Sequence, residues 1–148
     1  MPGCPECGAP SDRCERFFHE LIILDYSGRS PWAPLHAVSV SCYFFQHPSL
    51  VAGQEFYWAL LHLYLRDGQD ALIAHTVRAR RRNSHRYGGR APTVEDFPGA
   101  PPYPGPAVAP TTFATTIEDV AADGTFPAGG FADRARAWAE ATVAAWGF

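Results

Sequence analysis

Two cysteines near the start of the chain, Cys4 and Cys7, have the spacing of a metal-binding pair. They lie in the pentapeptide CPECG, and a third cysteine, Cys14, follows soon after. Two intervening residues let both sulfurs reach one ion, and thiolates are preferred ligands of zinc. Because CxxC pairs also occur by chance, the prediction of a zinc site depends on whether other ligands converge on this one.

Two histidines, His36 and His47, are candidates for the fourth ligand. They are eleven residues apart in the segment LHAVSVSCYFFQH. On a helix they would share a face but stand about 16 Å apart along the axis, at about 1.5 Å per residue. Since a Zn–N bond is about 2 Å long, at most one of the two histidines can join the cysteines.

The register of two predicted helices decides between these histidines. Helices at 12–26 and 35–47 are joined by a short connection, which favours an antiparallel hairpin. In such a pair, the residue numbers of facing positions have a constant sum. One value of that sum fits four pairs: Cys14 with His47, Phe18 with Tyr43, Leu21 with Val40, and Asp25 with His36. We therefore predict a zinc site of Cys4, Cys7, Cys14 and His47, which is structural because four protein ligands close it.

The same register places Asp25 beside His36 at the far end of the hairpin. A carboxylate next to an imidazole fixes its tautomer and raises its basicity, as in general bases. Tyr43 completes this candidate catalytic group, although it lies two turns away on the same stripe, too far to share one proton transfer. The plainer interpretation is a buried structural hydrogen bond that holds the hairpin together.

A third candidate site is the segment RARRRNSHRYGGR, residues 78–90, which holds half of the twelve arginines in the chain. Arg80, Arg81 and Arg82 could bind phosphate or carboxylate groups, since a guanidinium offers a planar bidentate fork. The alternative is that these arginines complement the dipole at the carboxyl end of a helix and keep a loop soluble.

Composition limits the classes of partner and compartment. The chain has 148 residues, 47% of them apolar, and a net charge of −3, which gives no general reason to expect a nucleic-acid partner. No apolar run approaches the roughly 20 residues that cross a bilayer, and no secretory signal is evident. We expect a cytoplasmic protein without a membrane partner, in which close cysteines bind metal rather than form disulfides.

The periodicity of the chain predicts an all-α fold. Apolar residues recur at helical spacing in segments 12–26, 35–47, 54–66, 69–82, 116–122 and 131–146. Segment 35–47 also has strand-like composition, but neither face of a strand would be cleanly polar, whereas a helix places His36, Val40, Tyr43 and His47 in one narrow stripe. We expect one domain over 1–148: a knuckle at 4–14, a four-helix core at 12–82, a Pro/Gly-rich loop at 83–115 and C-terminal helices at 116–148. Ser11 and Thr116 are the predicted N-caps, the latter with Asp119 as its reciprocal partner.

Three sequence features together resemble an uncharacterised bacterial domain-of-unknown-function family. They are CPECG, the run from Cys14 through FFHELIILD, and HAVSVSCYFFQHPSL, which matches an HxxxVxxYxxQHP pattern. The resemblance covers residues 4 to about 50 and continues more loosely to RAWAEATVAAW; it implies no activity. Two functions stay open: a zinc-binding enzyme of a specialised pathway that holds a small molecule near His36, and a non-catalytic zinc-braced module that binds a protein or anionic partner through residues 78–90.

Overall fold

Helices make up all the regular secondary structure in the part of the chain that this computed structural model describes, residues 3–50, 54–83, 97 and 99–147. The all-α fold class is confirmed. The α-helices are α1 (Cys14–Tyr26), α2 (His36–Gln46), α3 (Gln54–Asp67), α4 (Gln69–Asn83), α5 (Ile117–Val120) and α6 (Phe131–Ala145). Short 3-10 helices precede and follow α2, η1 (Ala33–Leu35) and η2 (Pro48–Leu50), and a third is η4 (Pro106–Val108).

Helix α2 lies at the centre of the bundle and contacts α1, α3 and α6. Its β-branched and aromatic residues, which could also form a strand, instead pack on several helices at once. Val38, Cys42 and Phe45 are almost completely buried. A central helix surrounded by others is apolar over most of its circumference, as this sequence is. The helical interpretation of residues 35–47 is therefore confirmed, with α2 ending one residue before His47.

A group of large aromatic side chains joins α2 to α3 and α6. The ring of Phe45 lies 5.3 Å from that of Trp58 and 5.6 Å from that of Trp146, both in edge-to-face geometry. The indole N–H of Trp146 donates a hydrogen bond to the carbonyl oxygen of Phe45, 3.0 Å away. Such pairs add directional preference to the burial of apolar area. These contacts fix the direction of α2 in the bundle and therefore the positions of its two ends, near His36 and His47.

Two helix starts test the predicted N-caps. Thr116 precedes α5, and its backbone N–H donates to the Asp119 carboxylate at 2.8 Å, so the predicted capping residues are confirmed. The prediction for Ser11 is wrong, because α1 begins at Cys14 after Arg13, with no side-chain cap. The Ser11 backbone N–H instead donates to Glu118 of α5, at 2.9 Å. This bond attaches the segment before α1 to α5 and does not cap α1.

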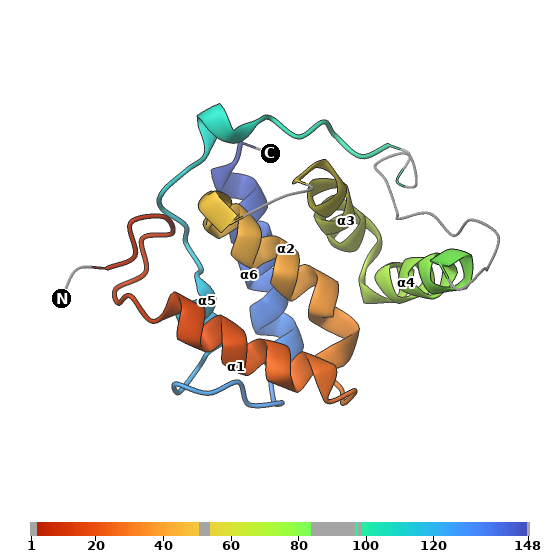
Figure 1. Ribbon diagram of the computed structural model, residues 1–148, viewed down its shortest axis with the longest axis horizontal. Helices are drawn as coiled ribbons and strands as arrows, with labels where there is room; N and C mark the ends of the chain where they lie inside the picture. Colours follow the sequence, from red (N-terminus) through yellow and green to blue (C-terminus); the bar gives the residue numbers. More distant parts are fainter. Residues whose placement is uncertain (1–2, 51–53, 84–96, 98, 148) are drawn as a thin grey trace.

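The proline-rich segment is only partly described. Residues 84–96 and 98 lie outside the described residues, whereas 99–115 cross the molecule from the α3 side to the N-terminal knuckle, residues 4–14 (Figure 1). The prediction that 83–115 has no regular structure is wrong at two points: α4 extends to Asn83, and η4 forms at Pro106 to Val108. In the described part of the chain, the helices are too short or too polar to cross a membrane.

Candidate metal centre

The four predicted zinc ligands lie together at one end of the α1–α2 pair. One ligand atom from each of Cys4, Cys7, Cys14 and His47 lies within 4.8 Å of the other three. The sulfurs of Cys7 and Cys14 are 3.6 Å apart. Two thiolates bound to one tetrahedral zinc are separated by about 3.8 Å, given Zn–S bonds of about 2.3 Å. The arrangement thus has the dimensions of a four-coordinate metal site.

The turn of the knuckle brings Cys4 and Cys7 to the same point. The N–H of Gly8 donates to the carbonyl oxygen of Cys4, and the N–H of Cys4 donates to the carbonyl oxygen of Ala9. Gly8 has a φ of 77°, a conformation that only glycine adopts without strain. This position also faces the backbone oxygen of Thr111, to which a Cβ would come within 3.0 Å. The final residue of CPECG is therefore required by the backbone itself.

The orientation of His47 is set by its own helix. Its Nδ1 lies 2.8 Å from the carbonyl oxygen of Tyr43, and because a carbonyl only accepts, Nδ1 must carry the proton. The other nitrogen, Nε2, is buried and makes no hydrogen bond within the described residues. Burying such an acceptor without a partner is costly. A metal ion bound at Nε2 would satisfy it, and a backbone partner at the opposite nitrogen is typical of histidine ligands.

The electrostatics of the cluster favour one thiolate before any metal is bound. The pKa of Cys7 falls to about 4, mainly because the Cys14 thiol donates a hydrogen bond to its sulfur; burial opposes this shift, and the nearby His47 supports it. The pKa of Cys14 is raised, since losing that proton would remove this hydrogen bond and leave two anions side by side in a buried place. A metal cation at the centre would instead favour the thiolate form of Cys14, because a metal binds the deprotonated sulfur.

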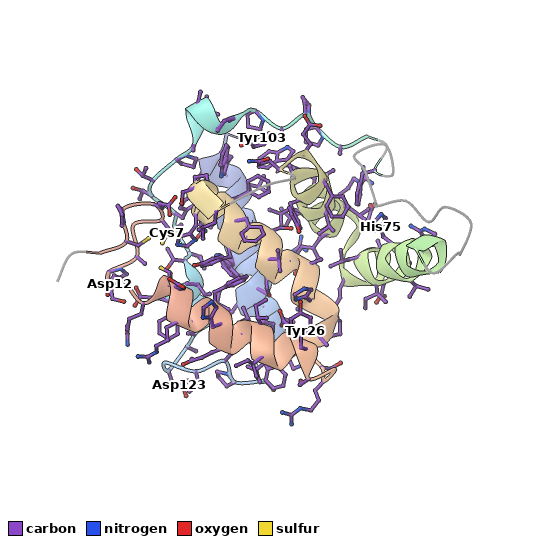
Figure 2. All side chains as sticks on the ribbon, viewed as in Figure 1. Cys7, Asp12, Tyr26, His75, Tyr103 and Asp123 are labelled. Carbon is purple, nitrogen blue, oxygen red and sulfur yellow. The ribbon has the colours of Figure 1, made fainter. Side chains whose placement is uncertain are left out.

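Tyr43 belongs to this end of the molecule. Its ring stacks on Phe18 at 3.9 Å between centroids and lies 4.2 Å from the ring of His47. Its pKa is raised by burial and by the nearby Cys14 sulfur. The contacts thus place Tyr43 as a packing residue beside the metal cluster, and its assignment to a catalytic group with His36 has no support in them. Figure 2 shows Cys7 on this side of the bundle and Tyr26 at the opposite end of α1.

The predicted Asp25 and His36 pair is present at that opposite end. His36 Nδ1 lies 2.9 Å from Asp25 Oδ2, with the Asp25 side chain fully buried and the His36 side chain 38% exposed. The carboxylate accepts the Nδ1 proton, so Nε2 of the neutral ring is an acceptor. Burial raises the pKa of Asp25, and the hydrogen bond from His36 opposes part of that rise. The pair therefore joins an exposed imidazole to a carboxylate that water does not reach.

His36 also lines a cavity of about 350 Å³ between the α1–α2 connection and α4. A small-molecule site near His36 was predicted from the sequence, but the contribution of Ile73 and Val77 of α4 to its wall was not. The other lining residues are small or apolar: Gly28, Ala33, Pro34 and Ala37.

The other described histidines belong neither to the metal cluster nor to the residues that line the His36 cavity. His62 lines a different, smaller cavity beside Arg66, and His75 packs on Phe97 at 4.3 Å. His19 is exposed on α1. Cys42 is completely buried among the helices and does not belong to the cluster. The backbone of Arg80, Arg81 and Arg82 continues α4, but their side chains lie outside the described residues, so the predicted anion or partner surface at 78–90 stays a prediction.

Three anchoring residues were not anticipated from the sequence. The N–H of Ser49 donates to the Glu6 carboxylate at 3.0 Å, which ties the knuckle to η2. Glu118 binds the Ser11 N–H and the Arg13 guanidinium, which ties it to α5. Gln46, next to His47, donates to the carbonyl oxygen of Thr115 and to the hydroxyl of Thr142. Each bond joins residues far apart in the chain, so no local pattern indicates it.

Comparison with known proteins identifies a family of unknown function. No curated protein matches the chain, and no solved structure does. A family model described as "Family of unknown function (DUF5946)" matches residues 2–147. Because this match spans nearly the whole sequence, it includes the knuckle, both ends of the α1–α2 pair and the C-terminal helix. The chain therefore belongs to the DUF5946 family.

Proposed function

We propose that this protein binds one zinc ion through Cys4, Cys7, Cys14 and His47, and that the ion fixes the knuckle to the helical bundle. The observation that carries the proposal is the convergence of four ligand atoms within 4.8 Å, one of them a buried imidazole nitrogen without a hydrogen bond in the described structure. Three sulfurs and one nitrogen are a common donor set of structural zinc. Soft thiolates disfavour magnesium and calcium, which prefer oxygen ligands.

With four protein ligands the coordination sphere is closed, so the zinc has a structural role. All four cysteines are free, as metal binding requires, and this fits a reducing, cytoplasmic location. Zinc would link residue 4 to residue 47 and hold the segment before α1 in place. What it stabilises is the end of the α1–α2 pair, whereas His36 lies at the other end.

The test is the metal content of the purified protein. We expect about one zinc per chain in the wild type and almost none in Cys7→Ser, measured by inductively coupled plasma mass spectrometry. Cys42→Ala is the matched control, because it removes a buried cysteine outside the cluster and should keep the zinc. Cobalt-substituted protein should show the absorption of tetrahedral cobalt bound to thiolates. Wild-type protein that neither contains nor takes up zinc would contradict the proposal.

A second function is favoured by the cavity at the other end of the pair. We infer that His36 acts there as a general base on a small molecule, with Asp25 as the positioning residue that holds its tautomer. The supporting observation is that His36 lines a cavity of about 350 Å³. Asp25 engages its Nδ1, which leaves Nε2 for a ligand. Cavities from about 300 Å³ upward accommodate small-molecule ligands.

This second function is tested in cells that lack the gene. Wild-type protein should restore the metabolite profile, and His36→Ala should fail to do so while keeping its far-UV circular dichroism and zinc content. His19→Ala is the control, since it removes an exposed histidine from α1 outside the cavity. Full restoration by a folded His36→Ala protein would exclude the base.

A further inference from the structure

The hydrogen-bonding direction of His36 limits what the cavity can recognise. Nδ1 is committed as a donor to Asp25 at 2.9 Å. On an imidazole ring the two nitrogens point in different directions, so Nε2 faces away from Asp25 and carries a lone pair in the neutral form. A ligand that approaches this nitrogen must therefore offer a hydrogen, from a hydroxyl or an N–H group. A carbonyl or ether oxygen would find no donor on His36.

The charges around the cavity disfavour ionic ligands. Among the described residues that line it there is no arginine, aspartate or glutamate, and the chain has no lysine. The Asp25 carboxylate lies behind His36 with no exposed side-chain surface, so it cannot contact a cation in the cavity. Its negative charge also disfavours an anion at Nε2. Among these described residues, an ionic ligand would find no charged partner in exchange for the hydration it loses.

The walls supply apolar area. Ile73 and Val77 of α4, although 36% and 41% exposed, face Ala33, Pro34 and Ala37 across the cavity. Covering such side chains with an apolar ligand is favourable in proportion to the area removed from water. The volume of about 350 Å³ is near the lower end for small-molecule sites. Small size, apolar walls and one acceptor are thus combined in one place.

From these three features we propose that the His36 cavity binds an uncharged, mainly apolar molecule through one hydroxyl group, which donates a hydrogen bond to Nε2 of His36. This ligand class rests on the proposed reaction site at His36 and makes it specific. It also identifies the proton that Nε2 would remove as a base, which is that of the bound hydroxyl. Simple phenols have the required combination of a compact apolar body and a single donor.

The test compares three probes of one shape on the zinc-loaded wild-type protein. The probes are 4-ethylphenol, its methyl ether 4-ethylanisole and the anion 4-ethylbenzoate. Nuclear magnetic resonance follows the imidazole nitrogens of His36 and the methyl groups of Ile73 and Val77. We expect 4-ethylphenol to shift Nε2 of His36 saturably and to bind roughly fivefold to tenfold more tightly than the ether, the effect of one hydrogen bond. The benzoate should bind more weakly than the phenol.

Two variants assign the preference to the ring nitrogen. His36→Leu should bind phenol and ether equally, whereas His19→Leu should keep the wild-type preference. Val77→Trp, which fills the cavity from α4, should weaken both probes. Because the wild-type comparison needs no variant, failure of His36→Leu to fold leaves the proposal testable.

Two outcomes would overturn the proposal in distinguishable ways. If phenol and ether bind wild-type protein equally and both shift Ile73 and Val77, the cavity is a ligand site but the hydroxyl class is wrong, and the proposed reaction site survives. If no probe shifts His36, Ile73 or Val77, both the ligand class and the reaction site are wrong.

Discussion

At the scale of single residues, the position of one proton defines the chemistry of two histidines. In His47, Nδ1 donates to the Tyr43 carbonyl, and in His36, Nδ1 donates to Asp25. Both rings are therefore held in the same tautomer, with Nε2 as the acceptor. The difference lies in the surroundings of the two residues: His47 lies with three cysteines at one end of α2, and His36 lines an apolar cavity at the other. The same tautomer thus prepares one ring for a metal and the other for a proton.

The buried carboxylate of Asp25 should leave a signature in the pH dependence of stability. Its pKa is raised above the usual value of 3.8, mainly by burial, so between that value and the raised pKa the folded state holds more protons than the unfolded state. Stability from this group is therefore complete below pH 3.8 and is lost as the pH rises through the folded pKa. Relative to Asp25→Asn, the free energy of unfolding of the wild type should therefore fall as the pH rises through this interval, as measured by urea unfolding.

Glu118 serves as a control of opposite sign in the same experiment. Burial raises the pKa of Glu118, but hydrogen bonds from the Ser11 N–H and from Arg13 outweigh it, and the net pKa is below the usual 4.5. Its contribution is present above pH 4.5 and disappears as the pH falls through the folded pKa. Relative to Glu118→Gln, the wild type should lose stability on acidification. Equal slopes for the two variants would contradict the assignment of Asp25.

At the scale of elements, the knuckle depends on partners outside itself. Residues 4–14 contain only turns before α1 begins, and a segment of this kind has few internal hydrogen bonds. Glu6 binds η2, Ser11 and Arg13 bind Glu118, and Gly8 packs against Thr111. The zinc proposed above adds the link to the end of α2. The knuckle is thus held on three sides by residues that come later in the chain.

Substitution of Gly8 tests how closely this fit is tied to the metal. Gly8→Ala should cost about 1–2 kcal/mol for the left-handed backbone, and more because its Cβ would come within 3.0 Å of the Thr111 oxygen. Gly28 has a similar φ of 75°, but a Cβ added there would meet no atom within 4 Å. We therefore expect Gly8→Ala to weaken zinc binding, measured by chelator competition, and Gly28→Ala to leave it unchanged. Equal zinc affinity in the two variants would show that the contact with Thr111 does not position the ligands.

At the scale of the whole molecule, metal binding and folding are coupled. The proposed ligands are brought together by the knuckle, by the start of α1 and by the residue after α2, and the unfolded chain has no such arrangement. A ligand that binds only the folded state stabilises it in proportion to the logarithm of its free concentration. The aromatic contacts among α2, α3 and α6 do not involve these ligands, so helices should persist without metal.

Unfolding in buffers of defined free zinc measures this coupling. Above the dissociation constant, the free energy of unfolding should rise by about 1.4 kcal/mol for each tenfold increase in free zinc. Cys7→Ser should show no such dependence, while Cys42→Ala should match the wild-type slope. Chelated wild-type protein should keep most of its far-UV circular dichroism. A stability independent of zinc in the wild type would exclude coupled binding.

The amino-acid sequence by itself determined the helices and the register of the first pair. Periodicity marked the helical segments, and the shared stripes placed Asp25 opposite His36, because 3.6-residue geometry relates spacing to face. The same register brought Cys14 and His47 to one end. These features depend on local geometry and on one short connection, which a sequence encodes directly.

Only the tertiary structure decided what surrounds those residues. Glu118 bound the backbone N–H of Ser11, Gln46 joined α2 to Thr115 and Thr142, and Tyr43 proved to pack beside His47. The cavity at His36 depends on the direction of α4, which no residue near His36 specifies. Contacts of this kind join positions far apart in the chain, and their geometry follows from packing a whole core at once rather than from any local pattern.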